Sequence, residues 1–158
     1  MFNTIGIICK PNDFTSQKTG LELGVFLKHK KVVLLEDSND FEKQADLIIV
    51  VGGDGTLLNT ARTYVDFNIP ILGINLGRLG FLTDVSVDSM ITVVGNILDG
   101  EFIKEKRSLL SCQIEQNGKV LSKNLAFNEV VIHRNLAPRM IEFELHVDDD
   151  FVNNQRAD

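Results

Sequence analysis

The sequence lacks the features typical of membrane proteins, secreted proteins, metal-binding proteins and nucleic-acid-binding proteins. It has no hydrophobic run of membrane-spanning length, and its N-terminus lacks the charged and apolar regions of a signal peptide. Its two cysteines, Cys9 and Cys112, and its three histidines have no spacing typical of a metal site. The net charge of −6 argues against non-specific binding to nucleic acid. We therefore expect a cytoplasmic protein that binds neither nucleic acid nor membranes, and we assign no metal-ligand set.

Two widespread nucleotide-binding signatures are also missing, namely Gly-x-x-x-x-Gly-Lys-Ser/Thr and Gly-x-Gly-x-x-Gly. Instead, an apolar run at residues 47–51 leads directly into Gly-Gly-Asp-Gly-Thr at residues 52–56. Glycines let backbone N–H groups approach a phosphate, and Asp54 can accept a proton or hold a metal ion. The pattern is typical of a strand that delivers a phosphate-binding loop to the edge of an α/β sheet. The alternative is a plain tight turn in which Asp54 caps the following helix.

The first hundred residues alternate between predicted strands and helices. Strands are expected at residues 4–9, 32–35, 47–51 and 69–74, and helices at residues 16–29, 56–65 and 87–98. Such alternation predicts a doubly wound parallel sheet of the Rossmann-like kind. In the first helix we expect Thr15 or Ser16 as the cap, with Leu21, Val25 and Leu27 facing the core. In the last helix we expect one apolar face made of Val87, Ile91, Val94 and Leu98.

After Gly100 the pattern changes to one typical of antiparallel strands. Asn117-Gly118 is a strong hairpin signal, and polar and apolar residues alternate along residues 141–147. The three acids at 148–150 are interpreted as a solvated turn rather than a metal site. We therefore expect an α/β nucleotide-binding domain at residues 1–100 and the beginning of a β-rich substrate domain at residues 101–158. No finishing element follows, so we expect a truncated chain that is inactive by itself.

Two further patterns are candidates for ligand binding. Residues 73–81 form a second glycine-rich loop after a predicted strand, which would place it at the same sheet edge as Asp54. Asn128 and Glu129 form an amide–acid pair between apolar stretches, and such a pair can bind sugar hydroxyls or the edge of a base. The structural alternatives are an ordinary long connection and a strand end.

Taken together, these motifs resemble those of the NAD kinases. The matching segments are GGDGTLLNTAR at 52–62, GINLGRLGFLTD at 73–84, FNEVVIHR at 127–134 and RAD at 156–158. GGDGT alone is shared with 6-phosphofructokinases and with diacylglycerol and sphingosine kinases, whereas LGFLTD followed by NE is much more specific. The resemblance covers essentially the whole chain. It implies an α/β domain followed by a β-sandwich domain, with the site between them.

The resemblance also implies roles for individual residues. Asp54 resembles the catalytic base, Gly55 a neighbouring nucleotide contact, and Phe81 a wall of the nucleotide pocket. Further positions resemble residues that bind the dinucleotide or contact ligand: Asn128, Glu129, Arg139, Arg156 and Asp158.

The reaction that the resemblance implies is phosphorylation of the 2′-hydroxyl of the adenosine ribose of NAD. It uses ATP or polyphosphate together with Mg²⁺ or another divalent cation, and it takes place in a homo-oligomer, a dimer or tetramer. The alternatives are a lipid or sugar kinase of the same superfamily, and a non-catalytic dinucleotide-binding fragment. Asp54 could be the base or could mainly hold the metal ion, and the residues leave both roles open.

Overall fold

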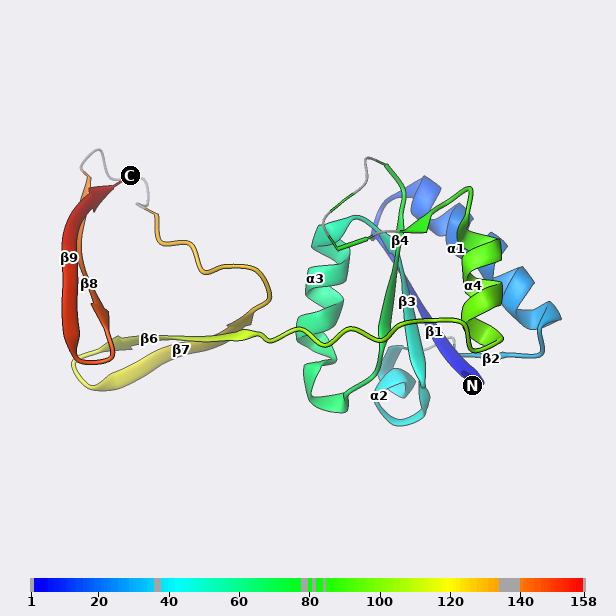
Figure 1. Cartoon of the computed structure of the whole chain (residues 1–158), viewed down its shortest axis with the longest axis horizontal. Helices are drawn as coiled ribbons and strands as arrows, with labels where there is room; N and C mark the ends of the chain where they lie inside the picture. Colours follow the sequence, from blue (N-terminus) through cyan, green and yellow to red (C-terminus); the bar gives the residue numbers. More distant parts are fainter. Residues whose placement is uncertain are drawn as a thin grey trace. The chain divides into compact units, whose positions relative to one another are not determined.

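The computed structural model describes residues 2–35, 38–77, 80, 82–83, 85–133 and 140–157. It forms two compact units, Met1–Leu109 and Leu110–Asp158 (Figure 1). Among the described residues, no helix has both the length and the apolar character needed to cross a membrane.

The first unit is built on a five-stranded sheet. Its spatial order is β2 (Val33–Leu35), β1 (Thr4–Cys9), β3 (Leu47–Gly52), β4 (Ile71–Asn75) and β5 (Val85–Ser86). All four neighbouring pairs are parallel. The order 2-1-3-4-5 is one of the two common doubly wound topologies. The predicted doubly wound parallel sheet is thus confirmed. The four predicted strands have bounds within two residues of the prediction, and the short strand β5 was not predicted.

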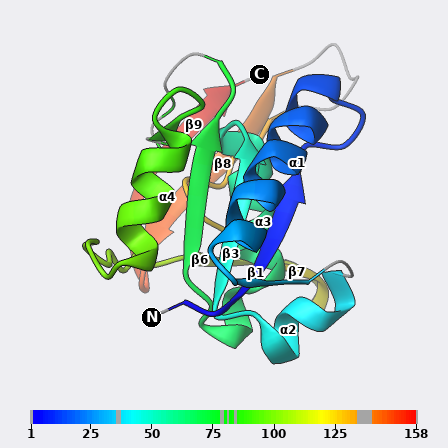
Figure 2. The same cartoon turned by 90° about the vertical axis from the view of Figure 1, so that its right-hand side faces the viewer.

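Helices cover both faces of this sheet (Figure 2). The helices are α1 (Phe14–His29), α2 (Phe41–Gln44), α3 (Asp54–Thr63) and α4 (Met90–Leu98), and two short 3-10 helices are η1 (Ser38–Asp40) and η2 (Val65–Phe67). Side chains of β3 alternate between two cores: Leu47, Ile49 and Val51 pack with α1 and α4, and Ile48 and Val50 pack with α2 and α3. Because β3 is buried on both faces, its sequence is a continuous apolar run.

The predicted inner face of α1 is wrong at two positions, and so is its cap. Leu21 and Val25 are 74% and 59% exposed. The buried stripe consists of Ser16, Thr19, Gly20, Leu23 and Leu27. Three of these residues are small or polar, so a search for large apolar residues finds the wrong stripe. The N-cap is Asp13, whose Oδ1 accepts a hydrogen bond from the Ser16 N–H at 2.9 Å.

The prediction for α4 is also partly wrong. The helix begins at Met90 rather than at residue 87, and Ile91 is exposed. Val94 and Leu98 are buried as predicted, together with Met90 and Ile97. Ile91 lies next to the buried stripe rather than on it, since Met90 takes the first inward position of the helix.

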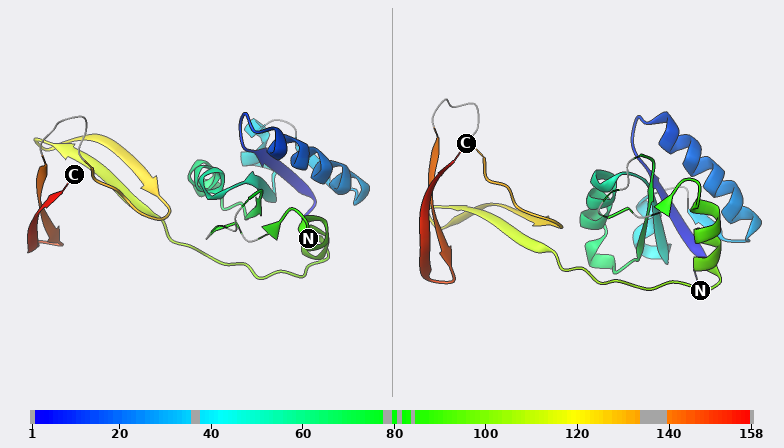
Figure 3. Two further views of the ribbon diagram at one scale, coloured as in Figure 1. Left: turned by 90° about the horizontal axis from the view of Figure 1, so that it is seen from above. Right: turned by 45° about the horizontal axis from the view of Figure 1, so that its top comes forward.

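The second unit consists of two antiparallel hairpins (Figure 3). The first joins β6 (Leu110–Gln116) to β7 (Lys119–Ala126), and the second joins β8 (Ile141–Val147) to β9 (Asp150–Ala157). In the first turn Asn117 and Gly118 have φ angles of 51° and 73°, as a type I′ hairpin requires. The predicted hairpin is confirmed. In the second hairpin the turn is confined to Asp148 and Asp149, because Asp150 already pairs with Val147.

Candidate functional site

Three loops of the first unit lie at the same edge of the sheet. Because the strands are parallel, β1, β3 and β4 all end at this edge, and the register pairs Cys9 with Val51 and Gly52 with Asn75. The chain order reverses between β1 and β3, and in doubly wound sheets ligands bind outside the carboxyl ends of the strands at this point. The Gly-Gly-Asp-Gly loop therefore occupies the position where this fold binds ligands.

Asp54 is the first residue of α3 and is half-buried at this edge. Its Oδ1 accepts hydrogen bonds from the backbone N–H of Leu82 at 3.2 Å and from the Thr83 hydroxyl at 3.1 Å. The N-cap of α3 is Gly53, and no side-chain bond is made there. Asp54 thus connects the start of α3 to the segment that follows β4, and the two glycine-rich loops predicted to be neighbours do meet.

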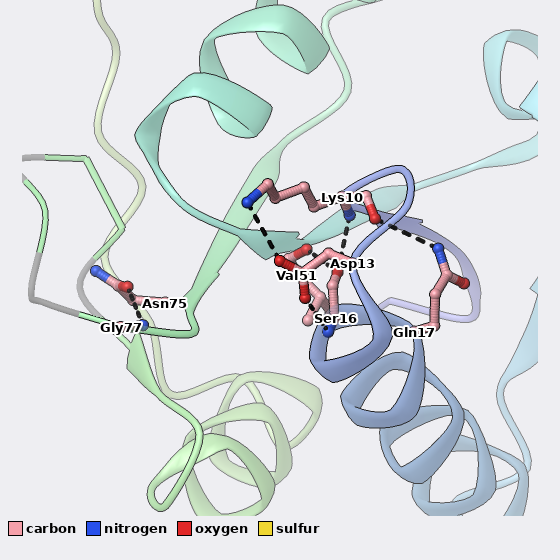
Figure 4. Close-up of polar contacts among 7 residues, drawn as sticks. All are labelled: Lys10, Asp13, Ser16, Gln17, Val51, Asn75 and Gly77. Atoms are coloured by element: carbon pink, nitrogen blue, oxygen red, sulfur yellow. Dashed lines mark hydrogen bonds and ion pairs between the residues drawn. The ribbon is translucent and has the colours of Figure 1, made fainter.

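Hydrogen bonds also link Thr83, a donor to Asp54, to Asn75 and Gly77. Neither Thr83 nor Asn75 was singled out from the sequence as an individual site residue. Thr83 is fully buried and Asn75 nearly so. Asn75 Nδ2 donates to the Thr83 carbonyl at 3.3 Å. Asn75 Oδ1 accepts from the Gly77 N–H at 2.9 Å (Figure 4). The signal that could have found these residues is a polar side chain, Asn75, ending a buried apolar strand, because such a side chain needs a partner.

The glycines of the first loop fall into two groups. A Cβ on Gly52 would lie 2.6 Å from the Thr56 hydroxyl oxygen, so this position is packed within the protein. At Gly53 and Gly55, by contrast, an added Cβ would meet no atom within 4 Å among the described residues, and neither backbone has a positive φ. Packing within the protein therefore explains why position 52 is a glycine. It does not explain the glycines at positions 53 and 55, beside which there is open space in the described structure.

The loop after β1 is fixed to the end of β3 by a second network (Figure 4). The Lys10 N–H donates to the Ser16 hydroxyl oxygen at 2.8 Å and to the Val51 carbonyl at 3.1 Å. The Ser16 hydroxyl in turn donates to the Val51 carbonyl at 2.6 Å. Lys10 Nζ lies 3.2 Å from Asp13 Oδ2. The Ser16 N–H, and after it Lys10, lowers the pKa of Asp13 below its usual value.

In the second unit, three predicted site residues lie within the described ranges. Asn128 and Glu129 follow the end of β7 and are both exposed. Arg156 is an exposed residue of β9, paired in register with Glu142 of β8, with which it forms an ion pair. Phe81, Arg139 and Asp158 were also predicted as site residues and lie outside the described residues. Gly55 lies beside Asp54 as the second residue of α3.

No group of three His, Cys, Asp or Glu side chains that could hold a metal ion occurs in the part of the chain that the structure describes. His146 is exposed on β8, where its ring lies 3.4 Å from Glu144 and contacts Phe151 edge-on.

Comparison with known proteins identifies relatives in sequence and in structure. Residues 28–102 match the family described as ATP-NAD kinase N-terminal domain. An NAD kinase from Hydrogenovibrio crunogenus is 45% identical over all of this chain and 60% of its own length. An NAD kinase from Nitrosomonas eutropha is 50% identical over 80% of this chain and 42% of its own length.

Two solved structures share the fold. The crystal structure of a yeast NADH kinase complexed with NADH has a TM-score of 0.85 at 21% identity, covering 99% of this chain and 55% of that chain. The crystal structure of an NAD kinase from Archaeoglobus fulgidus in complex with ATP has a TM-score of 0.69 at 26% identity. The match covers 97% of this chain and 57% of that chain. The chain thus spans 60% or less of the length of these relatives. By sequence, the whole of this chain is similar to an NAD kinase, and residues 28–102 match the N-terminal-domain model of that family.

Proposed function

We propose that the protein is an NAD kinase, which transfers the γ-phosphoryl group of ATP to the 2′-hydroxyl of the adenosine ribose of NAD. The observation that carries this proposal is the half-buried Asp54 carboxylate at the topological switch point, next to glycines that leave open space. The sequence similarity to curated NAD kinases supports the choice of substrate.

The glycine-rich loop is suited to phosphate. Because a Cβ added at Gly53 or Gly55 would meet no atom within 4 Å in the described structure, we propose that a ligand approaches the backbone closely at both positions. Helix α3 begins within this loop, and the N–H groups at the N-terminus of a helix carry a partial positive charge. Because the net charge of the chain is −6, binding an anion requires local groups such as these backbone N–H groups.

The reaction needs a group that takes the proton of the ribose hydroxyl. In our mechanism, the hydroxyl oxygen attacks the γ-phosphorus, its proton passes to the Asp54 carboxylate, and ADP leaves. General-base catalysis of this kind contributes about 10²–10⁴-fold. The rest of the rate comes mainly from positioning and from neutralising phosphate charge. Hydrogen bonds from Leu82 and Thr83 hold one carboxylate oxygen of Asp54 and so restrict its orientation.

A divalent cation, Mg²⁺ or another, belongs to the proposal as a companion of ATP. Magnesium is usually bound by one or two carboxylates plus substrate phosphates, with waters completing its shell. The single carboxylate of Asp54 beside a phosphate-binding loop fits such a cation. When bound, the cation would neutralise charge on the phosphates. Asp54 could then contribute as a ligand, as a base, or as both.

The remaining predicted residues enter the proposal through the family resemblance. Asn128 and Glu129 would bind NAD, and Arg156 would contact ligand, as would the positions Phe81, Arg139 and Asp158. We propose that residues 1–100 form the nucleotide-binding domain and that residues from 101 onward belong to the substrate domain. We further propose that the enzyme is a homo-oligomer, a dimer or tetramer, in the cytoplasm.

A product assay tests the function directly. The protein in its full natural length is incubated with ATP, Mg²⁺ and, in separate reactions, NAD, fructose 6-phosphate or diacylglycerol. We expect NADP and no other phosphorylated product, and NADP formation slower by about 10²-fold or more in an Asp54→Asn variant. Phosphorylation of the lipid or the sugar phosphate instead of NAD would assign the protein to another branch of the superfamily. NAD binding without turnover would favour a non-catalytic module.

A further inference from the structure

We infer that Thr83 is a positioning residue, whose hydroxyl sets the orientation of the Asp54 carboxylate for proton transfer. The inference rests on the proposed function, because it assigns Thr83 a role in the chemistry that we propose for Asp54. Thr83 itself touches neither substrate nor phosphate in this scheme.

The hydrogen bonds to Asp54 have a geometry that restricts the carboxylate. The Thr83 hydroxyl and the Leu82 N–H both donate to the same oxygen, Oδ1, at 3.1 and 3.2 Å. Two donors from consecutive residues restrict the position of that oxygen. The second oxygen, Oδ2, is thereby given a defined position relative to the loop. General bases must lie within hydrogen-bond reach of the proton they take, so this restriction bears directly on rate.

Thr83 is itself held rigidly. It is fully buried, and its side chain is β-branched, which leaves few rotamers. A Cβ on Gly73 of β4 would lie 2.7 Å from the Thr83 Cγ2 methyl, so this methyl occupies space that only a glycine leaves free. The packing fixes the methyl and therefore the direction of the hydroxyl.

Asn75 extends the support to the sheet. It is the last residue of β4, and its register partner is Gly52 of β3. Its side chain donates to the Thr83 carbonyl at 3.3 Å. The position of the Asp54 carboxylate is therefore tied, through Thr83 and Asn75, to the central strands of the sheet rather than to a surface loop.

A purely structural role for Thr83 is the competing explanation, and a set of three variants separates the two. Thr83→Val removes the hydroxyl at nearly constant shape. Thr83→Ser keeps the hydroxyl and removes the methyl. Thr60→Val is the matched control, because Thr60 is a buried threonine of α3 whose hydroxyl donates to the Thr56 carbonyl at 2.9 Å and not to Asp54.

Steady-state kinetics on the full natural protein give the answer. We expect Thr83→Val to lower kcat by about 10–100-fold, the usual size for loss of a supporting hydrogen bond, with KM for ATP and for NAD within about twofold. Thr83→Ser should keep kcat within about threefold of the wild type even if its melting temperature falls. Thr60→Val should keep the wild-type kcat.

Each other outcome has a definite meaning. Equal kcat values for Thr83→Val and Thr60→Val would overturn the inference while leaving the proposed function intact. A loss of kcat in Thr83→Ser as large as in Thr83→Val would also overturn it, since the hydroxyl is present in that variant. If the wild type forms no NADP from NAD, the proposed function fails, and the inference fails with it.

Discussion

Gly80 lies directly against the carboxylate of Asp54. A Cβ placed on Gly80 would be 2.7 Å from Cγ and 2.8 Å from Oδ2 of Asp54, which is closer than Cβ atoms approach other groups in real proteins. The absence of a side chain at position 80 is therefore a condition for the observed position of the Asp54 carboxylate.

The first prediction follows from this contact. Gly80→Ala should displace the Asp54 carboxylate and lower kcat by at least about tenfold, because small misplacements of a reacting group cost large factors in rate. The control is Gly77→Ala, since an added Cβ there meets nothing within 4 Å among the described residues. NADP formation should be measured for both. Equal rates in the two variants would show that the loop backbone shifts to accommodate the added methyl group without displacing Asp54, and that Gly80 does not position Asp54.

A second prediction separates the chemical role of Asp54 from its structural one. Asp54→Asn keeps an oxygen that accepts from Leu82 and Thr83, so we expect a near-normal melting temperature and a kcat lower by about 10²-fold or more. Asp54→Ala leaves the buried Thr83 hydroxyl without this acceptor and should reduce the free energy of unfolding by about 1–3 kcal/mol.

Urea unfolding checks the stability difference, with exposed Asp66→Ala as the control for loss of a surface acid. A near-normal kcat in Asp54→Asn would remove Asp54 from the role of base. A stability of Asp54→Ala equal to that of Asp66→Ala would mean that the two hydrogen bonds contribute little to folding.

The third prediction concerns recognition of NAD. Asn128→Ala and Glu129→Ala should each weaken NAD binding by about 1–3 kcal/mol, because each leaves a substrate group unpaired in the complex. ATP affinity should not change. Both residues are exposed, so neither substitution should lower the melting temperature. Calorimetry on the full natural protein measures the affinities, with Asn124→Ala on β7 as the matched control. Unchanged NAD affinity in both variants would contradict their assignment.

The fourth prediction tests which stripe of α1 faces the sheet. Leu23 is fully buried whereas Leu21 is 74% exposed, although the two leucines are only two residues apart. Leu23→Ala should therefore cost about 2–5 kcal/mol of unfolding free energy, and Leu21→Ala less than about 0.5 kcal/mol. Chemical denaturation of both variants gives the comparison. Equal costs would contradict the observed orientation of the helix.

The sequence was informative where local pattern and burial agree. A strand buried on both faces needs apolar residues throughout, so the apolar run at 47–51 was enough to predict β3. Asn117-Gly118 predicts a turn because both residues accept a positive φ. Helix α1 was predicted in extent but not in orientation. Its inner face uses small and polar residues, and their burial depends on how closely the helix approaches the sheet.

The site shows the same division. Asp54 was predicted as a site residue from its position between glycines after an apolar strand, and the structure places it at the carboxyl edge of the sheet. Thr83 and Asn75 were not found individually, because their importance arises only from contacts made in the folded chain. A motif can mark the segment 73–84, but it does not show which of its polar side chains supports Asp54.

The long sequence separation between Asp54 and its hydrogen-bond donors has a consequence for biosynthesis. The two donors follow Asp54 by 28 and 29 residues. In a nascent chain the glycine-rich loop therefore leaves the ribosome ahead of the residues that donate hydrogen bonds to its carboxylate. The two hydrogen bonds from Leu82 and Thr83 to Asp54 can form only once β4 and residues 82–83 are available to fold beside β3, so the position of this carboxylate depends on contacts distant in sequence rather than on the loop alone.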